Sequence, residues 1–414
     1  MIGYETFHKL LPPARLRALA ITYKVDACNQ VRLPAVTVFI CLLHGLLHHP
    51  DLTQRLLEEA YEQQTGHSAD HSSFGKRLAK ISPKYFRAIY QHLRQQLAPT
   101  VSEAQQQRLR LRFVDATIVS LSAKLLSFGL LQRTTRPGHS LRLVKSVFEL
   151  REDGFPELLH LCRTPSEKSD CVALGDQMIQ ASQPGDLWVF DAGCHDRHRL
   201  LSLHRLGASW ITPHSQQALR IRRTLFVSPT QSPPSQPPKT GEATFVLERV
   251  ESGVFGNAQE TPTEQAQWER MPLLVLRGWR FDTRRKVWAL LEILTNLPLS
   301  QDEQQAGPFR FLEVAQIYRD RWGIESFFKL VKQYVSFDHL ISRCEKGIEV
   351  MLYMTLILTW LLMWYQRKTG IDRGWRSVQS WLAHDVESWV QIALRKAKVM
   401  PVKPLPKDAY ANST

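Results

Sequence analysis

Residues 112–121 read Arg-Phe-Val-Asp-Ala-Thr-Ile-Val-Ser-Leu, and they mark the point at which the pattern of the chain changes from helical to extended. Apolar and β-branched residues dominate this stretch, which is typical of a strand. Asp115 stands inside it, and a carboxylate among apolar neighbours costs free energy to bury unless something binds it. The stretch therefore predicts a strand that carries a functional acid. An ordinary structural aspartate is the simpler alternative.

The chain before this strand, residues 1 to about 105, is predicted to be helical. Apolar positions recur at helical spacing through the four segments 7–23, 35–47, 52–61 and 85–97. The stretch 71–80 can start with a serine cap and present Lys76, Arg77 and Lys80 to a duplex, as in a helix-turn-helix-like DNA-binding domain. A helical packing domain with a basic surface is the alternative.

The chain after this strand alternates between strands and helices. We predict strands at 141–151, 157–162, 187–190 and 209–212, a helix at 166–181 and a further helix between the last two strands. This order is an α/β layout with an antiparallel start. Asp191 directly follows the apolar run at 187–190, and ligands bind at the carboxyl ends of strands in open α/β sheets. Asp191 is therefore a second candidate acid, with a turn-closing aspartate as the alternative.

A mainly β insertion is predicted over residues 215–303. The Pro/Ser-rich stretch 228–241 is expected to be a loop or semi-rigid linker. Strand-like runs follow at 244–250, 273–279 and 287–294. Helices are then expected from about Pro308 to about residue 398.

The apolar run at 350–365 is predicted to be a buried core helix and not a membrane span. It is shorter than the roughly 20 residues that a span needs. Glu349 and Arg367 also bound it closely.

Residues 318–332 read Tyr-Arg-Asp-Arg-Trp-Gly-Ile-Glu-Ser-Phe-Phe-Lys-Leu-Val-Lys. At ~100° per residue on one helix, an arc of ~80° collects an acid, a phenol and cations. These residues are Tyr318, Arg321, Glu325, Lys329 and Lys332. The carboxylate can hold a metal and the cations can hold a phosphate backbone. A solvated amphipathic helix with internal ion pairs is the alternative.

The net charge of +14 over 414 residues favours a polyanionic partner, either nucleic acid or an anionic membrane surface. A membrane-surface protein would explain this charge but not the acids. The six cysteines form no CxxC pair, and no His/Cys cluster has zinc-ligand spacing. With no signal peptide in view, these features predict a reducing, cytosolic setting.

The three acids Asp115, Asp191 and Glu325 can converge on one point. Hard oxygen donors without Cys or His suit Mg²⁺ or Mn²⁺. A pair of such ions can activate water or a 3′-hydroxyl at phosphorus. The acids therefore indicate metal-dependent phosphoryl transfer.

The spacing Tyr318-x2-Arg321-x3-Glu325-x6-Lys332 resembles the YREK signature of the insertion-sequence-four family of bacterial DDE transposases. The blocks that begin at Asp115 and Asp191 resemble those around the family's two aspartates. Residues 294–298, Leu-Thr-Asn-Leu-Pro, resemble the strand that closes its inserted domain. The resemblance runs from about Arg110 to about Leu362, and the four-residue signature is its most specific part.

The resemblance implies an RNase H-like catalytic core, with a mixed five-stranded sheet and flanking helices, interrupted by the β-rich insertion. The implied domains are 1–105 (DNA-binding), 106–214 and 304–370 (core), 215–303 (insertion) and 371–414 (helical C-terminal region). It further implies a bacterial, nucleoid-associated protein with no membrane partner.

The implied activity is cut-and-paste DNA transposition by a dimer that pairs two terminal inverted repeats, forms a hairpin and joins the ends to a target duplex. Asp115, Asp191 and Glu325 would hold two Mg²⁺ or Mn²⁺ ions. Tyr318, Arg321 and Lys332 would grip phosphates, helped by Lys329. Trp288 would hold a flipped base, with a core aromatic as the alternative. The sequence departs from the family at residues 192–195, Ala-Gly-Cys-His, where relatives often continue with Arg-Gly-Tyr or Arg-Gly-Phe.

Two other activities fit the same residues. A metal-dependent nuclease on this fold would cleave DNA without strand transfer. A non-catalytic DNA-binding derivative would bind the ends only, although all three acids are present.

Overall fold

A computed structural model describes most of the chain. The described residues are 2–26, 33–49, 51–97, 109–121, 130–133, 140–151, 154–162, 167, 169–194, 196–214, 220–228, 236–237, 245–256, 261–269, 271, 273–282, 285–297, 311–334, 341–342, 344–371 and 373–396. The expected helix start at Pro308 lies outside them.

The chain divides into two compact units. Unit 1 comprises Met1–Pro99, Ile118–Val144 and Phe327–Thr414, and unit 2 comprises Thr100–Thr117 and Lys145–Ser326. The helices near the two ends of the chain therefore belong to the same unit. The domain boundaries predicted from the sequence stay a prediction.

Unit 1 is mainly helical, as predicted for the first 105 residues. Its helices are α1 (Tyr4–Leu10), α2 (Pro13–Thr22), α3 (Ala35–His48), α4 (Gln54–Thr65), α5 (His71–Lys80), α6 (Pro83–Leu97), α13 (Glu345–Thr369) and α14 (Trp375–Lys396). The single apolar stretch at 7–23 is two helices, because Pro12 and Pro13 end α1 and begin α2. The N-cap of α5 is Asp70 and not a serine, and its side chain accepts a hydrogen bond from Ser72 N at 2.7 Å.

Helix α13 is the core of unit 1. By length and composition it could cross a membrane, but 83% of its apolar window is buried inside the unit. It packs against α6, α5, α14 and α3. The apolar run at 350–365 is therefore a core helix, as its length predicted.

Unit 2 is built on a mixed sheet whose order is β4-β3-β1-β5-β6-β10-β9-β8-β7. Its strands are β1 (Arg110–Leu121), β3 (Ser140–Arg151), β4 (Pro156–Leu161), β5 (Asp186–Val189), β6 (Ser209–Pro213), β7 (Arg220–Val227), β8 (Phe245–Gly256), β9 (Leu273–Asp282) and β10 (Val287–Thr295). Strand β5 is parallel to β1 and to β6, whereas β4 is antiparallel to β3 and the strands β6 to β10 to β9 to β8 to β7 are antiparallel. The last part of β1 and the first part of β3 are assigned to unit 1, and the short β2 (Leu130–Arg133) pairs with β3.

Three elements of this region did not emerge from the sequence pattern. Strands β2 and β7 and helix α10 (Pro262–Glu269) lie where the sequence suggested only loop or insertion. Strand β7 lies at a sheet edge and begins with arginines at 220, 222 and 223, so its apolar run, Leu225–Val227, is only three residues long and gives a weak strand signal.

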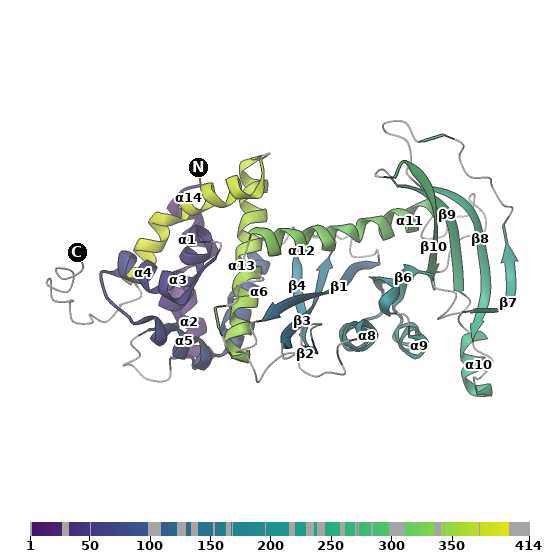
Figure 1. Cartoon of the computed structure of the whole chain (residues 1–414), viewed down its shortest axis with the longest axis horizontal. Helices are drawn as coiled ribbons and strands as arrows, with labels where there is room; N and C mark the ends of the chain where they lie inside the picture. The colour runs from purple at the N-terminus through teal and green to yellow at the C-terminus, as the bar shows by residue number, and fades with distance from the viewer. Residues whose placement is uncertain are drawn as a thin grey trace. The chain divides into compact units, whose positions relative to one another are not determined.

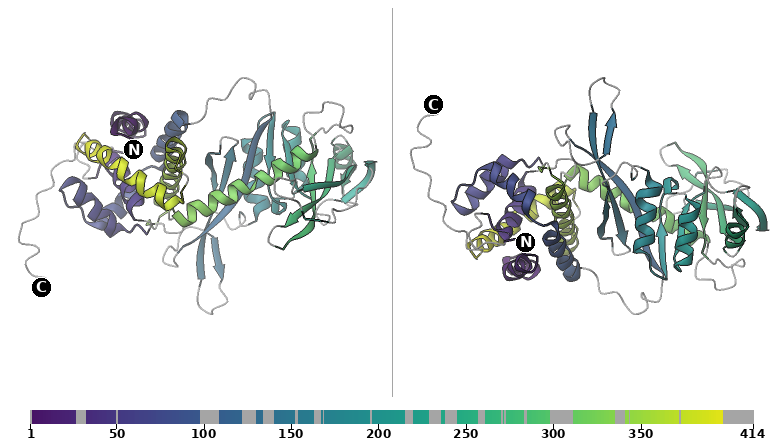
Figure 2. Two further views of the ribbon diagram at one scale, coloured as in Figure 1. Left: turned by 90° about the horizontal axis from the view of Figure 1, so that it is seen from above. Right: turned by 90° about the horizontal axis from the view of Figure 1, so that it is seen from below.

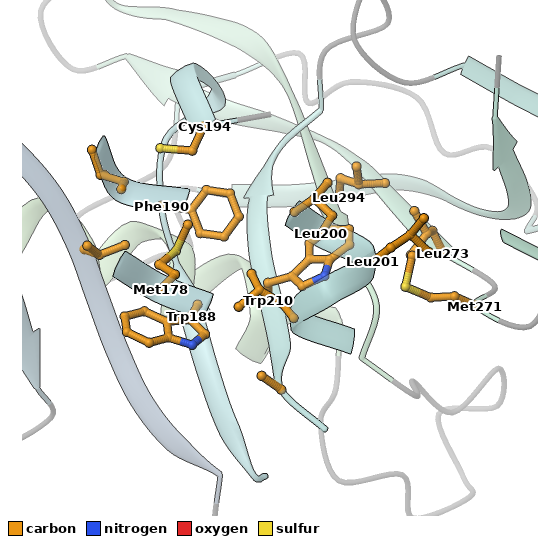
Figure 3. Close-up of a cluster of buried hydrophobic side chains, with 14 of the residues drawn as sticks. Met178, Trp188, Phe190, Cys194, Leu200, Leu201, Trp210, Met271, Leu273 and Leu294 are labelled. Atoms are coloured by element: carbon orange, nitrogen blue, oxygen red, sulfur yellow. The ribbon is translucent and has the colours of Figure 1, made fainter. Parts of the chain in front are cut away.

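Helices cover both faces of the unit 2 sheet. Helices α8 (Asp170–Ala181) and α9 (Arg197–Arg205) lie side by side on one face, and α11 (Phe311–Asp320) lies on the other (Figures 1 and 2). The face under α8 and α9 carries a large apolar core. Figure 3 shows Trp188, Phe190 and Trp210 among side chains from these two helices. Burying such aromatics contributes strongly to stability.

A buried arginine links three strands beneath the same two helices. Arg112 on β1 donates to Glu149 on β3 at 2.6 Å and 2.9 Å and to Asp186 on β5 at 2.7 Å. Its guanidinium carbon lies 3.8 Å from the centre of the Trp188 ring. This network fixes β1 between its neighbours, and β1 carries Asp115.

The last strand of the insertion is tied back to the sheet by side chains. The Asn296 amide oxygen accepts from Trp210 N at 2.8 Å, and the Thr295 hydroxyl donates to Trp210 O at 2.7 Å. The block 294–298 that the sequence singled out thus ends β10 beside β6, as far as Leu297; Pro298 lies outside the described residues.

Candidate active site

Strand register brings the two aspartates together. Strands β1 and β5 are parallel, and Phe113 pairs with Val189. Asp115 lies two residues further along β1 and Asp191 lies two residues past the end of β5, so continuing the register beyond β5 places them side by side. The neighbours Val114 and Phe190 point into the core under α8 and α9. Alternation along a strand therefore turns both aspartates to the opposite face of the sheet.

Each aspartate is held in the same local way. One oxygen of Asp115 accepts from Ala116 N at 2.7 Å, and one oxygen of Asp191 accepts from Ala192 N at 2.7 Å. Asp115 is half-buried and Asp191 is exposed at the end of its strand. The two aspartates therefore have matching backbone contacts, but Asp115 is half-buried and Asp191 is exposed.

Glu325, the third acid, lies on a helical segment that is interrupted at Arg321. The sequence predicted one continuous helix, but α11 ends at Asp320 and α12 (Trp322–Tyr334) begins at Trp322. Around this point the backbone makes tighter i to i+3 bonds, from Arg321 N to Tyr318 O at 3.2 Å and from Ile324 N to Arg321 O at 3.0 Å.

Arg321 connects this helix segment to the strand aspartates. Its Nη2 donates to Glu325 Oε1 at 2.8 Å, and its Nη1 lies 3.9 Å from Asp115 Oδ2. The Arg321 side chain is only 7% exposed, and its Nε has no hydrogen-bond partner among the described residues. Its guanidinium carbon lies 5.6 Å from the centre of the Tyr318 ring. The predicted Tyr318, Arg321 and Glu325 therefore meet Asp115 and Asp191 in one place.

Neighbouring charges shift the pKa values of Asp115 and Arg321. Burial raises the pKa of the Asp115 carboxyl to about 6. The negative charges of Asp170 and Asp191 raise this pKa further, whereas the Ala116 N–H and Arg321 lower it.

Arg321 responds to the same charges with the opposite sign. Burial alone would lower the pKa of Arg321, but Tyr318 and the three acids raise it above its ordinary value. The guanidinium is therefore a permanent cation amid these acids.

Asp170 and Lys145 are neighbours that the sequence did not single out. Lys145 Nζ lies 2.6 Å from Asp170 Oδ1, and the Lys145 side chain is only 1% exposed. A lysine inside the apolar strand 141–151 was the available signal. Because Asp170 carries charge next to Asp115, this pair belongs to the surroundings of the site.

The three acids do not form one tight cluster of ligand atoms. Among the described residues, two other groups have ligand atoms within 4.8 Å of one another: His44, His48 and Glu387, and His160, Cys162 and Glu167. The ligand atoms of Asp115, Asp191 and Glu325 therefore do not all lie within 4.8 Å of one another.

The other predicted DNA contacts have different surroundings. Lys329 is exposed, and Lys332 Nζ donates to Ile118 O at 3.4 Å within unit 1. Trp288 lies near the turn between β9 and β10, is half-buried and donates from Nε1 to Gln236 O at 2.9 Å. Its ring packs edge-on against Phe281 at 5.3 Å between centroids.

Of the three basic residues on α5, only two face solvent. Lys76 and Lys80 are exposed. Arg77 donates to Leu33 O at 2.8 Å and to Val25 O at 3.0 Å, and it also pairs with Asp26. These contacts favour a packing role for Arg77, which was one of the two alternatives for this stretch.

Comparison with known proteins gives a family. Residues 106–361 match the model of the transposase DDE domain. A protein of Synechocystis sp. assigned as the transposase of insertion sequence element IS4SA is 23% identical over 301 residues, which cover 72% of each chain. A piggyBac transposase in a synaptic complex with hairpin DNA aligns over 93% of this chain and 79% of its own, with a TM-score of 0.40 and 7% identity.

The family match spans most of the chain and includes both strand aspartates and the segment with Glu325. The chain belongs to the transposase DDE domain family, and it is a DNA transposase, an enzyme that cleaves DNA strands and transfers them.

Proposed function

We propose that this transposase moves an insertion sequence by a cut-and-paste route with Asp115, Asp191 and Glu325 as its catalytic carboxylates. The observation that supports this most directly is the parallel register of β1 and β5, which sets the two aspartates side by side. Arg321 then links Asp115 to Glu325. The order β4-β3-β1-β5-β6 is also the strand arrangement expected of an RNase H-like core.

The donor set fits hard divalent cations. The three acids offer only carboxylate oxygens, which suit Mg²⁺ or Mn²⁺. The raised pKa of Asp115 shows that burial and the neighbouring acids leave its negative charge undercompensated, and a cation there would compensate it. We propose that Asp115, Asp191 and Glu325 would together hold two such ions. Such ions, when bound, activate the attacking hydroxyl and stabilise the leaving oxygen at phosphorus.

The cations of the same segment are suited to hold the DNA backbone. The buried Nε of Arg321 has no acceptor among the residues that the structure describes, and a phosphate oxygen would supply one. Tyr318 beside it would orient the same phosphate through its hydroxyl. Lys329 and Lys332 would neutralise phosphates further along the strand.

In the proposed sequence of steps, water attacks a phosphorus at each element end and the bond to the 3′-oxygen breaks, which frees a 3′-hydroxyl. That hydroxyl attacks a phosphorus of the opposite strand and displaces the 3′-oxygen of the flanking DNA, which leaves a hairpin on the element end, with Trp288 holding a flipped base. Water then cleaves the hairpin and restores the 3′-hydroxyl, which attacks a phosphorus of the target DNA and displaces a 3′-oxygen of that strand. The role of the side chains is to position and to neutralise the charge that develops on phosphorus. Two copies of the chain would pair the terminal inverted repeats.

The test uses purified full-length protein, Mg²⁺, a duplex with the element's terminal repeat and a second target duplex. We expect the wild type to cleave the repeat and join its 3′ end to the target, and Asp191→Asn and Glu325→Gln to lose both activities. Asp320→Asn is the matched control, because this exposed acid of α11 accepts a hydrogen bond only from Gln316 in the described part of the chain.

The outcomes separate the alternatives. Cleavage that survives Asp191→Asn or Glu325→Gln rules out the site assignment. Cleavage without joining indicates a nuclease of the same fold, and binding without cleavage indicates a non-catalytic derivative.

A further inference from the structure

Two histidines of α3 and a glutamate of α14 converge in unit 1, whereas the acids described above belong to unit 2. His44 and His48 lie four residues apart and therefore face the same side of α3. Glu387 lies on α14, which packs against α3. One ligand atom from each residue lies within 4.8 Å of the other two.

The distances between these atoms match the edges of a tetrahedral site. His44 Nε2 lies 3.1 Å from Glu387 Oε2, and His48 Nε2 lies 3.7 Å from the same oxygen. For ligand bonds of about 2.1 Å, tetrahedral geometry separates neighbouring ligand atoms by about 3.4 Å. The observed distances lie on either side of this value, so small side-chain rotations would complete the site.

Gln64 completes the polar contacts around His44. Gln64 Nε2 donates to Glu387 Oε1 at 2.7 Å and also lies 3.2 Å from His44 Nε2. Without an ion, a proton on His44 Nε2 would be donated to Glu387 Oε2 at 3.1 Å. An ion in the same place would instead be shared by His44 Nε2, His48 Nε2 and Glu387 Oε2.

Two charged imidazoles are a poor alternative to one ion. The ring centroids of His44 and His48 are 4.3 Å apart, so protonating both places like charges in contact. One carboxylate oxygen faces both rings. A single divalent cation serves all three ligands at once, whereas a proton serves one pair.

We propose that His44, His48 and Glu387 bind one Zn²⁺ ion, which fastens α3 to α14. Two imidazoles and a carboxylate suit zinc and not Mg²⁺. Three protein ligands leave a fourth position for water. Gln64 donates to the other oxygen of Glu387 and would hold that carboxylate in position toward the ion.

The site is open enough for an ion to enter and closed enough to hold it. The His44 side chain is buried, whereas those of His48 and Glu387 are about one-third exposed. The ion would cross-link positions that are 343 residues apart in the sequence. A zinc ion bound here therefore stabilises the folded form of unit 1 by mass action.

The test strips full-length protein of metal with a chelator, adds Zn²⁺, removes the excess by dialysis and then measures the zinc that remains bound. We expect the wild type to retain one Zn²⁺ per chain and His48→Ala and Glu387→Gln to lose it. The melting temperature of the wild type should rise on adding Zn²⁺, and those of the two variants should not. Co²⁺ added to the stripped wild type should give the visible absorption bands of a tetrahedral site.

Three matched variants distinguish this site from others. His49→Ala removes the adjacent imidazole, whose ring centroid lies 6.5 Å from that of His48, and it should keep the ion. Asp191→Asn removes an acid of the proposed catalytic site, and His160→Gln alters the second compact group of ligands. Both should keep the ion as well.

The contrary results are equally clear. A wild type that retains no zinc and shows no change in melting temperature overturns the proposal and leaves a simple His–Glu ion pair. If His48→Ala retains zinc, or if Asp191→Asn loses it, the ion binds elsewhere. Because no outcome depends on DNA cleavage, failure here is distinct from failure of the proposed transposition.

Discussion

At the scale of single residues, the properties of the candidate active site depend on the charges that surround Asp115 and Arg321. Asp115 shares its surroundings with Asp191 and Asp170, and Arg321 is the cation among them. Arg321 compensates the charges of the acids unequally, because its Nη1 lies 3.9 Å from Asp115 while its Nη2 is bonded to Glu325. Asp115 is thus the acid with the most to gain from a bound cation.

This imbalance predicts a pH-dependent stability in the absence of metal. The pKa of Asp115 is raised in the folded state from 3.8 to about 6, so the folded state binds more protons than the unfolded state in that window. The free energy of unfolding therefore decreases as pH rises from about 4 to about 6, because the contribution of Asp115 is lost over this range. We expect Asp115→Asn, in chelator at pH 7.5, to melt several degrees above the wild type and this gain to vanish near pH 4.

The control for this measurement is Asp320→Asn, because that acid is exposed. A gain of similar size in the control, or a gain for Asp115→Asn that persists unchanged at pH 4, contradicts the assigned cause. Thermal unfolding followed by circular dichroism is sufficient.

Replacing Arg321 by lysine is expected to lower the rate of cleavage by about 10²-fold, because a lysine cannot contact two acids and a phosphate with a planar fork. Single-turnover cleavage measures the effect, and DNA affinity should change much less. Arg319→Lys, on the exposed side of α11, is the matched control. Equal effects of the two substitutions would show that only net charge matters.

At the scale of elements, the site depends on β1 being held between β3 and β5. Arg112 does this from the opposite face of the sheet, by its bonds to Glu149 and Asp186. The same strand therefore carries a buried structural cation and, three residues later, a candidate catalytic acid. Helix α11 adds the second feature, because its end at Asp320 allows the tight turn that presents Arg321.

We expect Arg112→Ala to destabilise the protein by about 3–5 kcal/mol, because it leaves Glu149 buried with only one of its arginine partners and removes the inner partner of Asp186. Denaturant unfolding measures the change. Arg110→Ala is a close control, since Arg110 lies two residues earlier and also contacts Asp186 at 2.9 Å but is half exposed. It should cost about 1 kcal/mol or less. A similar loss for both variants would contradict a special role for the buried network.

At the scale of the whole molecule, the helices near the two ends of the chain form one unit. Helices α3 and α14 pack together, as do α6 and α13. The apolar faces of helices α3 and α6 in the first 105 residues are completed by helices that lie more than 200 residues later.

We expect the fragment 1–105 alone to lack stable structure, since the buried faces of α3 and α6 would be exposed. A protein in which residues 1–99 are joined by a flexible linker to residues 341–396 should regain helical content and unfold cooperatively. Circular dichroism and hydrogen exchange measure both. A cooperatively folded 1–105 fragment would contradict this dependence.

The sequence alone predicted the alternation of strands and helices, and it singled out the three acids that we propose as catalytic. Those features are local: a change of apolar period marked β1 at Asp115, and a short apolar run marked β5 before Asp191. The positions of β2, β7 and α10 could not be predicted, because their residues lack a clear period.

Only the tertiary structure decided which side chains meet. It buried Arg77 against Asp26, placed Lys145 and Asp170 beside the acids and brought Glu387 to His44 and His48. The sequence showed no histidine or cysteine cluster with the usual zinc spacing, because the third ligand comes from a distant helix. The physical reason is that periodicity reports how a segment contacts water and core, whereas a site is assembled by packing between segments that the sequence keeps far apart.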